Sequence, residues 1–116
     1  MKHWKDLLVW QKSHELVLSV YRLTSDFPKS ERHGIVDQIR RAAASIPANT
    51  VEGHSRNSQK DFLRFLYIAR GSLEELRYFL LLSKDLSFIN AKKHIELEGD
   101  CEKVSKLLNG LIKSLS

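Results

Sequence analysis

The sequence predicts an all-α protein, an antiparallel up-down bundle of four helices that forms a single domain over residues 1–116. Two observations predict this fold class. Apolar residues recur every three or four positions in four separate segments, which is the period of an amphipathic helix. The chain also contains only two prolines and five glycines, which is little turn-forming sequence for a β-rich fold. Its 116 residues, 42% hydrophobic and 28% charged, fit one globular domain.

The first predicted helix spans about residues 6–26. Its apolar positions are spaced by seven, four, three and four residues: Val9, Leu16, Val20, Leu23 and Phe27. Charged and hydroxyl side chains occupy the opposite face, so the segment is amphipathic. Pro28 disfavours helical geometry at the residue before it, and the helix therefore ends there.

The second predicted helix spans about residues 33–53. Its apolar face is formed by four residues spaced by four, three and four: Ile35, Ile39, Ala42 and Ile46. Pro47 falls inside this pattern, where it lacks a backbone N–H and clashes with the preceding turn. We therefore expect a kink or break at Pro47, with Ser45, Asn49 and Glu52 around it.

A polar stripe runs beside the apolar face of this helix and consists of Gln38, Arg41, Ser45, Asn49 and Glu52. One interpretation is structural: Asn49 bonds the backbone groups that Pro47 leaves without partners. Glu52 then holds either Arg41 or Arg56. The other interpretation is a recognition surface, in which basic side chains contact phosphates: Arg40, Arg41 and Arg56.

The third predicted helix spans about residues 58–86, and the fourth about residues 90–115. Ser58 begins the third helix, because Asp61 three residues later makes this segment resemble a capping box, and Asn90 is the N-cap of the fourth. The core positions of the third helix are Phe62, Leu66, Ala69, Leu73, Leu76 and Leu80. Those of the fourth are Leu97, Cys101, Val104, Leu108, Leu111 and Leu115.

The outer side of the third helix is more apolar than a solvent-exposed face, because it holds Leu63, Tyr67, Gly71, Tyr78 and Leu81. A helix that is apolar nearly all round is buried nearly all round. A bundle of this size can bury such a face only against another chain. We therefore expect a homo-oligomer with these five residues at the interface. The alternative is that a displaced fourth helix or Trp4 covers part of this side.

Nineteen Lys and Arg against fourteen Asp and Glu give a net charge of +5, which favours an anionic partner such as nucleic acid. Basic residues lie along the second helix and the first half of the third, and Tyr67 and Tyr78 of the third helix are available for stacking. The candidate nucleic-acid surface comprises Arg40, Arg41, Arg56, Lys60, Arg64 and Arg70. Glu74 and Glu75 interrupt this track, so the alternative is a solvated face held by salt bridges.

The sequence offers no catalytic, metal-binding or cofactor-binding motif. His14-Glu15 resembles the start of a zinc-protease helix, but Leu18 stands where the second histidine is needed. Cys101 is the only cysteine, and its place on an apolar stripe indicates a buried, inert thiol. Because these motifs are missing, we expect a non-enzymatic protein. We also expect it to be cytoplasmic, since no segment is apolar enough to span a bilayer and no signal sequence begins the chain.

Five segments of the chain resemble one family, the bacterial four-helix-bundle proteins encoded in intervening sequences of 23S ribosomal RNA genes. The segments are DLLVWQK (residues 6–12), YRLTSDFP (21–28), QIRRAAASIPAN (38–49), EG (52–53) and FLYIARGSLEEL (65–76). The blocks at residues 45–49 and 69–75 are the most specific. The chain departs from the family at Thr50-Val51, where Ile-Ala is common, and at Ser87, where Gly is usual.

The resemblance implies a left-handed bundle that assembles as a ring, commonly a pentamer, with no enzymatic activity established. The family is also similar, more distantly, to the accessory protein of diversity-generating retroelements, a basic pentameric barrel that binds nucleic acid and a reverse transcriptase. We therefore expect a non-enzymatic oligomer that binds RNA or an RNA-associated protein. The alternative is a structural or protein-interaction scaffold with no nucleic-acid role.

Overall fold

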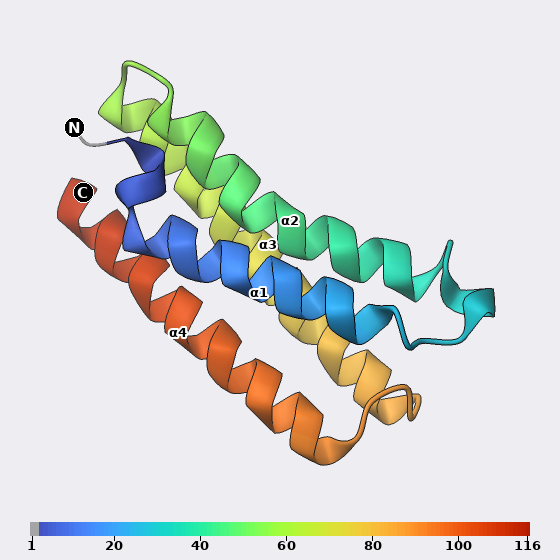
Figure 1. The fold of residues 1–116 in the computed structure, drawn as a ribbon. Coiled ribbons are helices and arrows are strands. Elements are labelled where there is room, and N and C mark those ends of the chain that lie inside the picture. Colours follow the sequence, from blue (N-terminus) through green and yellow to red (C-terminus); the bar gives the residue numbers. More distant parts are fainter. Residues whose placement is uncertain (1–2) are drawn as a thin grey trace.

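The computed structural model describes residues 3–116, which form four α-helices and two short 3-10 turns (Figure 1). The turn η1 (Trp4–Asp6) precedes α1 (Leu8–Thr24), and η2 (Lys29–Glu31) precedes α2 (Ile35–His54). The chain continues with α3 (Gln59–Asp85) and α4 (Ala91–Leu115). Residues 3–116 contain no strand. The prediction of an all-α protein with four packed helices is therefore confirmed.

The helices pack side by side as long rods, and the connections lie at the two ends of the molecule (Figure 1). One end holds η1, the α2–α3 connection and Ser116, and we call it the terminal end. The α1–α2 and α3–α4 connections lie at the opposite end. The side chain of Gln59 donates a hydrogen bond of 2.6 Å to the Leu115 carbonyl, and Arg77 pairs with Glu98. These contacts show that α3 and α4 run in opposite directions.

The core is built from the apolar stripes of the four helices. Every stripe residue predicted for α2 and α3 is buried, as are Val9, Leu16 and Val20 of α1. The end of α4 differs from the prediction, since Ile112 is buried whereas Leu111 and Leu115 are only partly buried. At about 100° per residue, Leu111 and Ile112 lie about equally far to either side of the stripe formed by the preceding core residues of α4. Packing at the end of the bundle, and not helical spacing, therefore selects Ile112.

Helix α2 continues without a break through Pro47, which is buried. The break that the sequence allowed is thus absent, and a bend of the helix axis stays a prediction. Proline has no N–H to donate to the carbonyl one turn earlier. The Asn49 amide donates hydrogen bonds of 2.8 Å to the carbonyl and the hydroxyl of Ser45, and not to the Ala43 carbonyl that Pro47 leaves without a donor. The Ser45 hydroxyl lies 2.8 Å from that of Ser72, which links α2 to α3.

The end of α3 is closed by a Schellman motif. The N–H of Phe88 donates to the Ser83 carbonyl at 2.8 Å, and the N–H of Ser87 donates to the Lys84 carbonyl at 2.9 Å. This arrangement places Ser87 at a φ of 65°, the left-handed region that glycine occupies without steric cost. The helix start is also capped, because the Ser58 hydroxyl accepts from the Asp61 N–H at 3.1 Å.

Candidate nucleic-acid interface

The six basic residues predicted to bind nucleic acid do not lie on one surface. Arg40 is half-buried between α2 and the end of α1. Its Nε donates to the Thr24 hydroxyl at 2.9 Å, one terminal nitrogen donates to the Tyr21 carbonyl at 3.3 Å, and its guanidinium lies 4.5 Å from the centre of the Tyr21 ring. Arg40 thus links α2 to α1, with two of its five N–H donors used inside the chain.

Arg41 lies on the outer side of α2, apart from the basic residues of α3. Its Nε is 3.6 Å from the carboxylate of Asp37, one helical turn earlier, and both side chains are exposed. Of the two partners that the sequence allowed for Glu52, the structure selects Arg56, at 2.9 Å. The polar stripe of α2 therefore separates into local pairs.

Arg56, Lys60 and Arg64 come together at the terminal end, where α3 begins; we call them the arginine cluster. Phe65 lies beneath it, with the Arg64 guanidinium 4.5 Å and the Arg56 guanidinium 5.2 Å from the ring centre. A guanidinium held over an aromatic face loses less side-chain freedom when it binds an anion. All three cluster residues are exposed.

Arg70 lies further along α3 and turns toward α4. It donates a hydrogen bond of 3.2 Å to the Asn109 side chain, and its guanidinium lies 4.8 Å from the centre of the Tyr67 ring. Neither interaction neutralises its charge. Arg70 therefore extends the basic surface from the arginine cluster toward α4.

Charge is unevenly distributed along the α3–α4 pair. Residues 56–73 and 103–116, which lie toward the terminal end, contain seven Lys and Arg and one acidic residue. Residues 74–102 contain four Lys and Arg against seven Asp and Glu. In this second part Arg77 is held by Glu98, Glu74 and Glu102. Partial burial lowers the pKa of Arg77. The hydrogen bond to Glu98 and the negative charges of the three glutamates together outweigh this effect, so the pKa of Arg77 is raised.

The lysines of α4 on this surface were missed by reasoning from the sequence. Lys106 and Lys113 are exposed on α4 near Arg70 and the α3 start, respectively, because α4 runs back beside α3. The available signal was the segment 103–116, which holds three lysines and no acidic residue. Its relation to the α3 arginines depends on helix direction, which composition alone does not give.

Four of the five predicted interface residues are exposed on the outer side of α3. Tyr67, Tyr78 and Leu81 expose 47%, 57% and 40% of their surface, and the position of a Cβ at Gly71 has no atom within 4 Å. Leu63 instead packs partly against the core. Trp4 does not cover this side, because its ring packs on Trp10 of α1 at 4.8 Å, and η1 contacts only α1 and α2.

An apolar residue of α4 also lies exposed at the level of Leu81. Ile95 exposes 71% of its surface. The ion pair between Arg77 and Glu98 shows which turns of α3 and α4 are neighbours. Because the helices run in opposite directions, Leu81, four residues after Arg77, lies beside the turn of α4 that precedes Glu98 and contains Ile95. The apolar outer side therefore continues onto α4.

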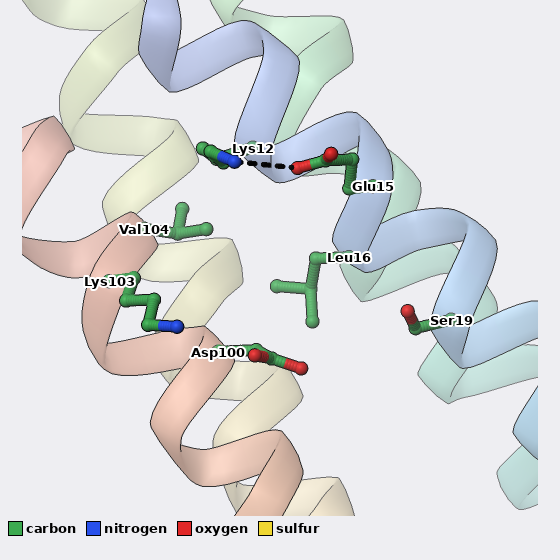
Figure 2. Close-up of a pocket in the computed structure, with 7 residues that line it drawn as sticks. All are labelled: Lys12, Glu15, Leu16, Ser19, Asp100, Lys103 and Val104. Carbon is green, nitrogen blue, oxygen red and sulfur yellow. Dashed lines mark ion pairs between the residues drawn. The ribbon is translucent and has the colours of Figure 1, made fainter.

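A pocket of about 230 Å³ lies between α1 and α4 (Figure 2). It is lined by Lys12, Glu15, Leu16, Ser19, Asp100, Lys103 and Val104. Lys12 pairs with Glu15 at 3.3 Å, and no histidine stands beside Ser19 to act as its base. The charges in the pocket are balanced, and the lining contains no nucleophile–base pair.

Cys101 lies in the core of the bundle. Cys101 is fully buried, and burial raises the pKa of its thiol to about 12, so the nucleophilic thiolate is strongly disfavoured. Within residues 3–116, no three His, Cys, Asp or Glu side chains gather as a metal site. No helix in this part of the chain is long and apolar enough to cross a membrane.

Comparison with known proteins places the chain in a family. The family model of 23S rRNA-intervening sequence proteins matches residues 5–110. Among solved structures, the chain is similar to a protein of unknown function from the S23 ribosomal protein family of Bacteroides thetaiotaomicron VPI-5482. The two are 29% identical over 94% of this chain and 98% of that chain, with a TM-score of 0.86. No curated protein matches the chain. Since the family model spans nearly the whole bundle and the solved structure shares its fold, the chain belongs to the 23S rRNA-intervening sequence protein family.

Proposed function

We propose that the protein is a non-enzymatic homo-oligomer that binds RNA through the basic residues of its terminal end. The observation that carries this proposal is the arginine cluster, Arg56, Lys60 and Arg64, at the start of α3. Among the described residues, only Glu52 forms an ion pair with any of the three. The cluster therefore keeps an exposed positive charge, which suits the continuous phosphate charge of a nucleic-acid backbone.

The cluster favours contact with phosphates over recognition of bases. Its side chains are cationic, and Phe65 beneath them already holds two guanidinium groups. Phosphate contacts position a protein on nucleic acid but carry no sequence information. Binding therefore depends on salt concentration and is nearly independent of RNA sequence.

Self-association strengthens this proposal. The exposed apolar residues on the outer side of α3 support assembly, and the family resemblance favours a ring, commonly a pentamer. Each subunit adds one arginine cluster, and linked copies raise the affinity for a long polyanion far above that of a single cluster. A modest charge on each chain is thereby sufficient.

The test is a titration of structured RNA, including large-subunit ribosomal RNA fragments, at several salt concentrations. We expect the logarithm of the affinity to fall linearly with the logarithm of salt concentration. The triple variant R56Q/K60Q/R64Q should bind much more weakly and with a shallower salt slope. The matched control is R22Q/K29Q/R32Q, which removes three positive charges from exposed residues at or near the opposite end.

Two outcomes would contradict the proposal. One is the absence of binding by the unmodified protein at low salt. The other is a triple variant that remains oligomeric and binds RNA with the same salt slope as the unmodified protein.

The second candidate function is a protein-interaction scaffold with no nucleic-acid role. The observation that favours it is the size of the exposed apolar side, which includes Tyr67, Tyr78 and Leu81 on α3 and Ile95 on α4. An intact oligomer that does not bind RNA at low salt would support this alternative. An RNA-associated protein would then be the partner to seek.

A further inference from the structure

The exposed face of α4 carries a second row of positive charge near the terminal end. Lys106 and Lys113 are seven residues apart, which is two helical turns and about 10 Å, so both point to the same side of α4. Both side chains are exposed, and neither forms an ion pair with any residue in 3–116.

This row lies beside the basic residues of α3. Asn109, which stands between the two lysines along α4, accepts the hydrogen bond of Arg70 at 3.2 Å. At the end of the pair, the Gln59 side chain reaches the Leu115 carbonyl, which brings Lys113 level with the start of α3. The two helices thus present two neighbouring rows of cations.

The surface between the lysines is open at Gly110 and carries no aromatic side chain for stacking on bases. A Cβ at Gly110, which also lies between Lys106 and Lys113 along α4, would have no atom within 4 Å, so the surface is open at this point. Residues 103–116 contain no aromatic side chain. Single-stranded nucleic acid is bound by aromatic rings on which unpaired bases stack. Two rows of cations on rigid helices are suited instead to two phosphate chains.

We infer that Lys106 and Lys113 form, with Arg70 and the arginine cluster, one double-row surface for the backbone of double-helical RNA. This inference rests on the proposed RNA binding and adds to it a second helix and a class of RNA. Double-stranded RNA is recognised largely through its shape and its phosphates, because its narrow major groove hides the bases. The α4 row has no aromatic side chain, and the rings of Phe65 and Tyr67 on α3 already hold guanidinium groups, so the surface presents mainly cations and matches that mode of recognition.

The test compares three proteins by titration with an RNA duplex and with each of its separated strands: the unmodified chain, K106Q/K113Q and K92Q/K93Q. The last is a matched control, since it removes the same charge from the same helix in its acidic half. We expect K106Q/K113Q to bind the duplex about tenfold more weakly at low salt, with a salt slope smaller by about 1.5, because each lost phosphate contact removes 0.7–0.9. The control should bind as the unmodified chain does.

The outcomes separate this inference from the proposed function. If R56Q/K60Q/R64Q loses binding while K106Q/K113Q retains it, the double-row surface is wrong and RNA binding by the cluster stands. If the unmodified chain binds no RNA, both are wrong. Binding to a single strand that equals or exceeds binding to the duplex overturns the assignment to double-helical RNA. Far-ultraviolet circular dichroism and light scattering of each variant show that the fold and assembly are intact.

Discussion

At Gly53, α2 lies so close to α3 that there is no room for a side chain. A Cβ at this position would lie 2.6 Å from the Cβ of Phe65 and 3.0 Å from the Phe62 ring. Both neighbours belong to α3, so the helices would have to move apart. We expect Gly53→Ala to lower the free energy of unfolding by about 1–3 kcal/mol, as overpacked cores do. Urea denaturation measures this difference.

The matched control for this change is Gly110→Ala, which has open space around the new methyl group. An alanine there should raise the free energy of unfolding by about 0.5–1 kcal/mol, because alanine favours a helix more than glycine does. Equal effects of the two substitutions would show that the contact between Gly53 and Phe65 does not limit the packing of α2 on α3.

Asn49 tests the two interpretations of the polar stripe on α2. Its amide donates to the carbonyl and hydroxyl of Ser45, so Asn49→Ala leaves these half-buried groups with fewer partners. We expect a loss of about 1–3 kcal/mol in the free energy of unfolding. Thermal denaturation followed by circular dichroism measures the loss. An unchanged melting temperature together with weakened RNA binding would favour the recognition surface instead.

At the scale of helices, Ser87 ends α3 in a conformation that suits glycine. A non-glycine residue in the left-handed region costs roughly 1–2 kcal/mol, which a glycine at position 87 would avoid. The greater freedom of glycine in the unfolded chain offsets part of this gain. We expect Ser87→Gly to raise the free energy of unfolding by about 1 kcal/mol in chemical denaturation. Ser55→Gly is the control, because Ser55 follows α2 with a φ of −74° and gains nothing from glycine.

The sequence predicts the helices well because each one depends on local patterns. Apolar spacing located the buried face of α2 and α3, and the side chains of Ser58 and Asn90 accept the capping hydrogen bonds expected of them. The prediction was wrong at the end of α4, where Ile112 is buried in place of Leu111, since both are apolar and only packing selects between them.

The basic surface was predicted less well, because its members meet through tertiary contacts. Arg40 looked like a phosphate ligand, but the end of α1 supplies its partners from residues sixteen and nineteen positions away. Lys106 and Lys113 were not identified as part of this surface from the sequence. Their position near Arg70 follows from the direction and register of α4, which no local pattern encodes.

At the scale of the whole molecule, the outer side of α3 predicts assembly. We expect light scattering at micromolar concentration to report several times 13.4 kDa. Gly71→Glu should dissociate the assembly, because a charged side chain would stand among Tyr67, Tyr78 and other apolar residues. Gly99→Glu on α4 is the control, since Gly99 is equally exposed and helical. A monomeric unmodified chain would contradict the prediction.

The uneven charge along α3 and α4 also makes the bundle an electric dipole, with its positive pole at the terminal end of a molecule 43 Å long. The field of a polyanion exerts a torque on such a dipole and turns the positive pole toward it before the surfaces touch. Orientation of this kind speeds productive encounters and is weakened by added salt. The separation of charge along one pair of helices therefore acts on the rate of association as well as on the strength of the complex.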